Sequence, residues 1–171
     1  MNPGLLIYLL QQKLGAELNI LFPKTVKPIA CNIKLTENCQ SRCITCSYWQ
    51  EKWDDLISTE KAKSLLTDEL PGLGVQYLRF TGGEPLLRKD LFEIIESIPK
   101  DVYKKIILKT NGLLIGKYAS EINNSQVTDV SVSIDGLEET NDKIRGIKGG
   151  FNKIFKNLRK IKNFCRTSLI Y

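Results

Sequence analysis

Three cysteines lie close together in the segment "NCQSRCITCSYW". Their spacing is Cys39-x3-Cys43-x2-Cys46, and the chain contains no histidine. Structural zinc takes four protein ligands, so Cys31, Cys165 or a carboxylate would have to complete such a site. A cubane [4Fe–4S] cluster held by only three thiolates keeps one iron open to an exogenous ligand. The cysteines are therefore predicted to bind a metal, with an open iron–sulfur cluster favoured and zinc as the alternative.

A second candidate group is the segment "RFTGGEPLLR". Gly82 and Gly83 carry no Cβ, so the backbone there can approach a ligand closely. Glu84 supplies a carboxylate that could accept from an ammonium group. The alternative is a tight turn with a solvated glutamate, which explains one glycine better than a pair followed by Glu-Pro. This segment is predicted to contribute to a binding site.

Two shorter segments, "KTNG" and "SIDG", place polar groups directly before a glycine turn. They contain Asn111, Ser133 and Asp135. Asn-Gly and Asp-Gly turns are common, so each segment alone is a weak signal. All four groups, however, follow predicted strands, and α/β sheets and barrels bind ligands at the carboxyl ends of their strands. One shared site is therefore expected at that edge.

Strand-like and helix-like segments alternate along the chain and must position these groups. The predicted strands are 30–36, 75–81, 105–110 and 128–135, and the predicted helices are 58–70, 90–98, 113–122 and 151–164. Such alternation implies right-handed crossovers and a parallel sheet. The segment "TSLIY" resembles the start of a fifth strand.

Local signals mark some of the helix ends. Ser58 is expected to cap the first helix and "PG" to end it. Asp90 with Glu93 resembles a capping box. The second helix carries one apolar stripe that should face the core. Its members are Leu91, Ile94, Ile95 and Ile98.

The strands alternate between apolar and polar residues. In "VSVSID", three aliphatic residues point one way, and Ser131, Ser133 and Asp135 point the other. A parallel strand buried on both faces would read as a continuous apolar run. Helices should therefore cover one face, and the polar face should line a wet or ligand-filled concavity. The expected fold class is α/β: a partial (β/α) barrel with parallel strands and about four and a half β/α units, since a closed barrel needs about 250 residues.

Composition is that of a globular protein, with 171 residues, 42% hydrophobic and 26% charged, and a net charge of +6. We expect residues 1–29 to form an N-terminal helix and lead-in, and residues 30–171 a core domain that is incomplete at its C-terminus. The apolar start "GLLIYLL" is too short to span a bilayer and is expected to dock on the domain, a membrane-surface anchor being the alternative. No signal peptide is found, and clustered cysteines indicate a reducing, cytoplasmic setting.

The three-cysteine motif, together with "GGEP" after the second predicted strand, resembles the radical S-adenosylmethionine (SAM) superfamily over residues 30 to 165. The resemblance implies that Cys39, Cys43 and Cys46 hold a [4Fe–4S] cluster whose open iron binds the amine and carboxylate of SAM. It further implies one-electron cleavage of SAM to methionine and a 5′-deoxyadenosyl radical, which takes a hydrogen atom from a substrate. The protein would position that radical and exclude competing reactions.

The resemblance also assigns SAM contacts by motif. Gly82, Gly83 and Glu84 should meet the methionyl ammonium group. Arg145, in "NDKIRG", resembles the basic residue for the methionyl carboxylate, although a surface cation is the alternative. The remaining residues are expected near the ribose or the methionyl end; they are Asn111, Ser133 and Asp135.

Departures from the family pattern leave the substrate unassigned. Thr45 stands where many members have an aromatic residue near the adenine. "LRFTGGEPLLR" also resembles the GTP cyclase of molybdenum-cofactor synthesis, in which the arginine matching Arg79 binds GTP, but the expected first-strand arginine is Asn32 here. Cofactor- and peptide-maturing relatives fit comparably. The resemblance implies a small-molecule or peptide substrate and an electron donor such as a ferredoxin or flavodoxin.

The predicted last helix has a basic face comprising Lys153, Lys156, Arg159, Lys160 and Lys162. Such a face could contact nucleic acid, but the opposite apolar stripe favours a solvated surface, so nucleic-acid binding is not expected.

Two rival interpretations stay open. One is a truncated or non-catalytic iron–sulfur or zinc module, and the other is a split enzyme in which a partner chain completes the barrel.

Overall fold

The computed structural model describes residues 27–50 and 57–161 and the backbone of residues 167–169. Three predicted features therefore lie wholly or partly outside the described residues. These are the N-terminal helix, the end of the last helix (162–164) and Cys165.

Five parallel strands form one sheet in the order β1-β2-β3-β4-β5. They are β1 (Ala30–Thr36), β2 (Tyr77–Gly82), β3 (Lys105–Thr110), β4 (Asp129–Ile134) and β5 (Thr167–Leu169). All four predicted strands and the predicted fifth are present. Within the described residues β1 and β5 are not paired with each other, so the sheet is open. The predicted fold class, an α/β partial barrel of parallel strands, is confirmed.

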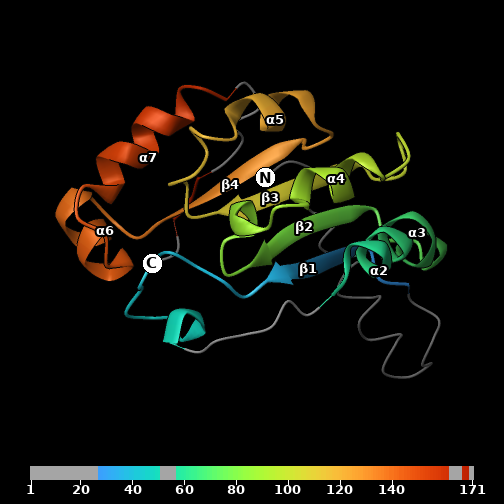
Figure 1. Cartoon of the computed structure of the whole chain (residues 1–171), viewed down its shortest axis with the longest axis horizontal. Coiled ribbons are helices and arrows are strands. Elements are labelled where there is room, and N and C mark those ends of the chain that lie inside the picture. Colours follow the sequence, from blue (N-terminus) through green and yellow to red (C-terminus); the bar gives the residue numbers. More distant parts are fainter. Residues whose placement is uncertain (1–26, 51–56, 162–166, 170–171) are drawn as a thin grey trace, which may run out of the picture.

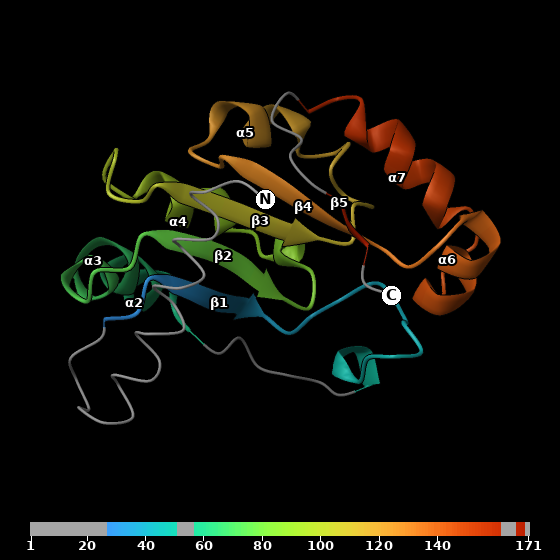
Figure 2. The ribbon, with the colours of Figure 1, turned by 180° about the vertical axis from the view of Figure 1, so that it is seen from behind.

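The helices pack mainly on one face of this sheet (Figure 1). They are α2 (Thr59–Ser64), a π-helical turn (Leu65–Glu69), α3 (Leu70–Gly72), α4 (Leu91–Glu96), α5 (Ala119–Asn124), α6 (Glu138–Arg145) and α7 (Gly150–Leu158). Viewed from behind, the strands lie in front of α4, and no described helix covers this face (Figure 2).

The core lies between the sheet and the helices. Leu78 and Phe80 of β2 and Leu108 of β3 are fully buried, as is the whole predicted stripe of α4. Alternate residues of the same strands, such as Arg79, stay exposed on the opposite face. Burial of apolar side chains on one face only is what the alternating pattern predicted.

Two of the predicted helix boundaries are confirmed, and the capping box is wrong. Ser58 Oγ accepts from the Lys61 backbone N–H at 3.2 Å, and α3 ends at Gly72. Asp90 makes no side-chain cap. Its carboxylate instead binds the Arg88 guanidinium and the Thr59 hydroxyl, so it is not available for the helix N–H groups.

The predicted helix 113–122 begins six residues late, as α5. The reason is a side chain from another helix. Asn157 Nδ2 donates to the backbone carbonyls of Gly112 and Leu113, at 3.0 and 3.1 Å, and a helix starting there would need those carbonyls for its own bonds. Gly116 has no room for a side chain, because a Cβ would lie 2.2 Å from Asn157 Oδ1.

Helix α6 was not predicted, because its sequence "EETNDKIR" carries no apolar stripe. Its last two carbonyls accept from the cysteine loop: Ile44 N–H donates to Ile144 at 2.9 Å and Arg42 N–H to Arg145 at 3.2 Å. Gly146 ends the helix with a φ of +67°. Tertiary hydrogen bonds at its carboxyl end therefore help to hold a helix that has few apolar residues to pack.

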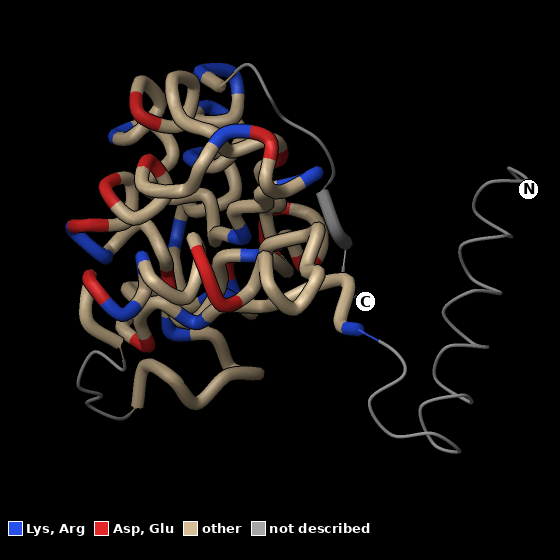
Figure 3. The backbone as a smooth tube through the Cα atoms, turned by 90° about the vertical axis from the view of Figure 1, so that its right-hand side faces the viewer, with Lys and Arg blue, Asp and Glu red and all other residues tan. Residues whose placement is uncertain are grey.

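No described helix is long and apolar enough to cross a membrane. Basic and acidic residues are interspersed over the backbone rather than separated into two halves (Figure 3). On α7 the predicted apolar stripe is only partly buried: Ile154 is buried, whereas Phe155 is 43% exposed and packs against Phe151 with ring centroids 4.6 Å apart.

Candidate cofactor site

A cavity of about 190 Å³ lies at the carboxyl ends of the strands, where the loops after β1, β2 and β3 meet the end of β4. It is lined by all three cysteines of the motif. Five other predicted site residues share it: Gly82, Gly83, Asn111, Ser133 and Arg145. Glu84 and Asp135 are not among its lining residues. The structure thus brings most of the predicted site together, as the positions of the motifs on the strands indicated.

The cysteine loop is held by contacts outside the sheet. Two of its backbone N–H groups donate to carbonyls at the end of α6, as described above. In addition, the Trp49 indole N–H donates to the Cys43 carbonyl at 3.0 Å. Cys39 is partly buried, Cys43 is buried and Cys46 is exposed. The loop therefore has a fixed backbone, while its three thiols differ in their access to solvent.

Two polar side chains contact the thiols directly. Asn111 Nδ2 lies 3.8 Å from Cys39 Sγ, and Arg145 Nη1 lies 3.8 Å from Cys43 Sγ. Burial raises the pKa of the Cys39 thiol, and hydrogen bonds from the Ser41 backbone and from Asn111 act in the opposite direction. Donors aimed at sulfur stabilise a thiolate, which is the form that binds metals.

The types of side chain at the cavity distinguish between the two candidate metals, an iron–sulfur cluster and zinc. Of the residues that the structure describes, no aspartate or glutamate lines the cavity, and the chain has no histidine. Cys31 packs against the hydrophobic core near the start of β1, at the opposite end of that strand. Among the described residues, no group of three or more cysteine and carboxylate side chains is gathered closely enough to hold a metal ion in this structure. Three thiols on one cavity fit a cluster with an open iron better than four-coordinate zinc.

Gly82 and Gly83 allow two loops to touch. A Cβ at Gly82, where φ is +127°, would lie 2.1 Å from the Thr36 carbonyl oxygen, and one at Gly83 would lie 2.3 Å from that of Asn38. The backbone N–H of Gly83 donates to Thr36 at 2.9 Å. The glycine pair therefore seats the start of the cysteine loop, in addition to lining the cavity.

Glu84 is fully buried and faces the end of β3. Its carboxylate accepts from the Thr110 hydroxyl at 2.7 Å, the Asn111 N–H at 2.8 Å and the Leu86 N–H at 3.2 Å. Burial raises the pKa of this carboxyl, and these hydrogen bonds partly offset the effect. In this structure Glu84 joins the loop after β2 to the end of β3; its contact with an ammonium group stays a prediction.

The remaining predicted residues, Asn111, Ser133, Asp135 and Arg145, lie at or next to the cavity. Asn111 also donates to Ser41 Oγ at 3.2 Å, so it ties the end of β3 to the cysteine loop. Ser133, at the end of β4, is buried at the cavity wall. Asp135 forms an ion pair with Arg145, in which both side chains are mostly buried. Asp135 is thus placed to orient the arginine that contacts Cys43.

Several cavity residues were not among the predicted site residues. They are Ser41, Thr45, Tyr48, Trp49, Thr81, Lys109 and Thr110. Thr81 and Lys109 could have been found from the alternation of their strands, since both fall on the polar face next to a motif. Tyr48 gave no such signal: it lies on a 3-10 turn (Tyr48–Gln50), and its proximity depends on how the cysteine loop folds back.

The amino-acid sequence is similar to those of known proteins. The family model for the Radical SAM superfamily matches residues 33–171. The Fe-coproporphyrin III synthase of Methanosarcina barkeri is 36% identical over 141 residues, which cover 80% of this chain and 34% of that protein. A probable GTP 3′,8-cyclase of Archaeoglobus fulgidus is 36% identical over 138 residues, covering 80% and 45%. The chain spans less than half the length of these relatives.

Solved structures share the fold. The structure titled native anSMEcpe with bound AdoMet matches with a TM-score of 0.63 and 26% identity, over 80% of this chain and 42% of that one. Streptococcus suis SuiB bound to S-adenosylmethionine matches with a TM-score of 0.70 and 20% identity, over 85% and 34%. Together with the family match, these findings establish that this chain belongs to the radical SAM superfamily, whose members use a [4Fe–4S] cluster and SAM.

Proposed function

We propose that this chain is the core of a radical SAM enzyme that binds a [4Fe–4S] cluster and reductively cleaves SAM. One observation carries the proposal: Cys39, Cys43 and Cys46 line one cavity at the carboxyl ends of the strands, and no other cysteine or carboxylate is among the described residues that line it. A structural metal would be enclosed by four ligands, whereas a reactive one keeps a position open.

The three thiolates would hold the cluster. When bound, the cluster and SAM would supply a 5′-deoxyadenosyl radical that removes a hydrogen atom from the substrate. Arg145 places a positive charge beside Cys43, which offsets the negative charge of the thiolate. Asn111 donates to Cys39 in the same way. Both side chains would donate to the sulfur atoms that hold the cluster.

The cavity also offers groups for SAM. Gly82 and Gly83 present backbone to it, and the methionyl ammonium would lie there. Arg145, held by Asp135, would meet the methionyl carboxylate. Ser133 would lie near the ribose or the methionyl end. The Glu84 carboxylate holds the Asn111 backbone and the end of β3, and its contact with the methionyl ammonium is part of the same proposal.

The relatives bind chemically different molecules. One is named for Fe-coproporphyrin III, others for GTP, and one SuiB structure holds a precursor peptide, SuiA. A small molecule or a peptide is therefore proposed as substrate. An electron donor such as a ferredoxin or flavodoxin, a cytoplasmic location and a partner chain that completes the barrel belong to the same proposal.

The test is anaerobic reconstitution with iron and sulfide, followed by assay of SAM cleavage under reductant. Cys43→Ala should abolish both the brown chromophore and cleavage, because a thiolate ligand is lost. Cys31→Ala is the matched control and should keep both, since Cys31 packs on the core away from the cavity. Cleavage retained by Cys43→Ala would contradict the cluster assignment, and a wild-type cluster that cannot cleave SAM would indicate a non-catalytic module.

A further inference from the structure

Three basic residues occupy neighbouring strands of the sheet. Lys34 is on β1, Arg79 on β2 and Lys109 on β3. In the parallel register Lys34 stands beside Thr81 of β2, and Phe80 stands beside Leu108, so Lys109 flanks Thr81 from the other side. With neighbouring strands about 4.8 Å apart, the three Cα atoms fall within a patch roughly 10 Å across.

All three side chains project from the face that no described helix covers. Their neighbours along each strand are buried in the core: Ile33 and Leu35, Leu78 and Phe80, and Leu108. Because side chains alternate along a strand, the basic residues point the opposite way. Lys34 and Arg79 are exposed, and Lys109 is partly exposed and lines the cavity with the cysteines. The basic patch is thus continuous with the cofactor site.

Two of the acidic groups nearby are already engaged, and a third is buried without an ion pair to any described residue. Asp129, on the same face, pairs with Lys105 at 3.1 Å and accepts from the Thr128 hydroxyl at 2.8 Å. Glu84 is buried against the end of β3 and accepts from Thr110. Glu37, beyond β1, is buried with its Oε2 unpaired among the described residues, and its charge is the smallest of the causes that raise the pKa of Lys34. No described carboxylate forms an ion pair with Lys34, Arg79 or Lys109. Within the described part of the chain, their charge is therefore available to a ligand.

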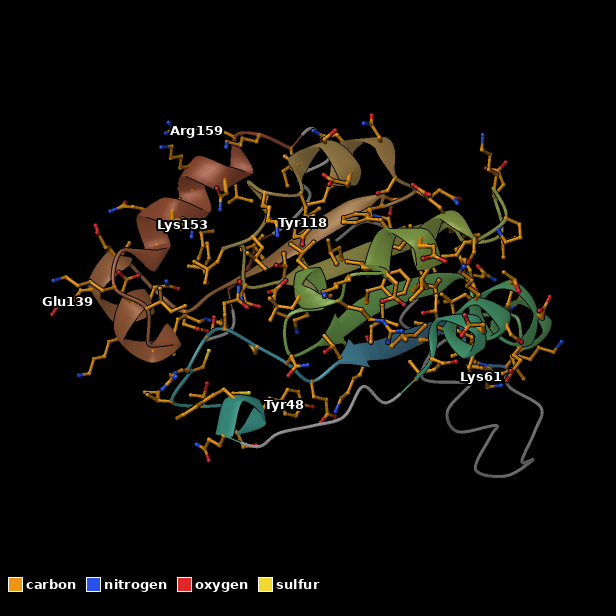
Figure 4. The ribbon with its side chains drawn as sticks, in the orientation of Figure 1. Tyr48, Lys61, Tyr118, Glu139, Lys153 and Arg159 are labelled. Carbon is orange, nitrogen blue, oxygen red and sulfur yellow. The ribbon has the colours of Figure 1, made fainter. Side chains whose placement is uncertain are left out.

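Tyr48 connects the patch to the cavity. The Lys34 ammonium donates to the Tyr48 hydroxyl and lies 4.8 Å from the centre of its ring. Tyr48 itself lines the cavity and extends from its 3-10 turn toward the carboxyl end of β1 (Figure 4). This contact holds the long lysine side chain beside the site and lowers the entropic cost of using it.

We infer that Lys34, Arg79 and Lys109 form the substrate site, and that the substrate is a small molecule with at least two phosphate or carboxylate groups. The inference rests on the proposed function and names the substrate class of that same site. Arginine binds such groups through two parallel hydrogen bonds, and lysine adds a mobile point charge. Three separated cations suit a ligand whose negative charge is spread over several groups.

The experiment measures binding of pyrophosphate and of citrate to the full chain by titration calorimetry, without cluster or SAM, at two salt concentrations. Pyrophosphate binding would indicate a phosphorylated substrate and citrate binding a polycarboxylate. Lys34→Met, Arg79→Met and Lys109→Met should each weaken binding about tenfold, because each removes a charge-assisted hydrogen bond. Lys34→Arg and Lys109→Arg should keep most of the affinity.

Lys153→Met is the matched control, since Lys153 is an exposed lysine on α7 (Figure 4). Binding of neither anion, or equal weakening by Lys153→Met, would overturn the inference. Cys43→Ala separates the two proposals, because it should bind the anions normally while failing to cleave SAM. Normal anion binding by a wild-type protein that cannot cleave SAM would defeat the proposed function alone, and cleavage without anion binding would defeat the inference alone.

Discussion

The loops after β1 and β2 lie against each other but use their polar groups in opposite ways. In the loop after β2, the Glu84 carboxylate accepts three hydrogen bonds, and Arg88 donates to the Leu35 carbonyl at 2.6 Å and to Asp90. In the loop after β1, the backbone is held by α6 and Trp49 while the thiols face the cavity. The loop after β2 therefore has a structural role, and we call it the frame loop. The loop after β1 presents metal ligands.

This difference separates stability from function within one site. Substitutions in the frame loop should lower the free energy of unfolding, because they leave buried groups unpaired or force backbones apart. Substitutions at the thiols should leave that free energy nearly unchanged and remove metal binding. Variants of the two loops should therefore differ in which property they lose, stability or metal binding.

Gly82→Ala should have the largest effect. Position 82 has a positive φ that alanine rarely adopts, and the added Cβ would lie 2.1 Å from the Thr36 carbonyl oxygen. We expect a loss of about 3 kcal/mol or more in urea unfolding, because backbone strain and a backbone clash add. Gly72→Ala is the control, since nothing lies within 4 Å of its added Cβ. Equal stability of the two variants would show that the loops can move apart freely.

Glu84→Ala should cost about 3 kcal/mol, since it leaves the Asn111 and Leu86 N–H groups and the Thr110 hydroxyl without their acceptor. Glu93→Ala, at an exposed position of α4 that pairs with Lys63, should cost less than about 1 kcal/mol. Both are measured by chemical unfolding. If Glu84→Ala kept wild-type stability and lost only SAM binding, Glu84 would contact SAM and would not stabilise the loop after β2.

The Arg88–Asp90 pair should make stability depend on acid. The Arg88 guanidinium holds the pKa of Asp90 at about 2, below its ordinary 3.8. Because the unfolded chain takes up this proton first, the contribution is complete above about pH 4 and is lost as the pH falls toward 2. Asp90→Asn should cost about 2 kcal/mol at pH 7, within the range for hydrogen bonds to a charged group.

This effect is checked by the unfolding free energy between pH 7 and pH 2. The difference between wild type and Asp90→Asn should shrink across the acid range. A constant difference would mean that the carboxylate charge contributes nothing and that only its shape matters.

Cys46→Ala should have the smallest effect on stability and the sharpest effect on metal. Cys46 is exposed, so the change in unfolding free energy should stay within about 0.5 kcal/mol. Iron content after anaerobic reconstitution should nevertheless fall to a small fraction of the wild-type value. A stability loss comparable to that of Glu84→Ala would place this thiol in the frame.

The sequence predicted what depends on periodicity and missed what depends on long-range hydrogen bonds. The strands were found because their apolar residues alternate, and the motifs were placed correctly because parallel strands end at one edge. The start of α5 was wrong because Asn157, far along the chain, binds the carbonyls of Gly112 and Leu113. No local pattern carries that information.

The site shows the same limit. Membership of the cavity could be predicted for the cysteines, glycines, Asn111, Ser133 and Arg145 from motifs. The direction of a side chain could not. Glu84 turns into the core, and Asp135 turns to Arg145, because partners on other segments compete for their oxygens. Tyr48 joins the site through the way the cysteine loop folds back, which brings its hydroxyl to Lys34.

The most direct test of the account is the electron paramagnetic resonance spectrum of the anaerobically reduced protein, with and without SAM, together with its iron and sulfide content. Three cysteine ligands and an open iron predict a [4Fe–4S]⁺ signal that changes when SAM is added. A protein without a cluster, or a signal unaffected by SAM, would contradict the claim that these three thiols hold a cluster with an open position.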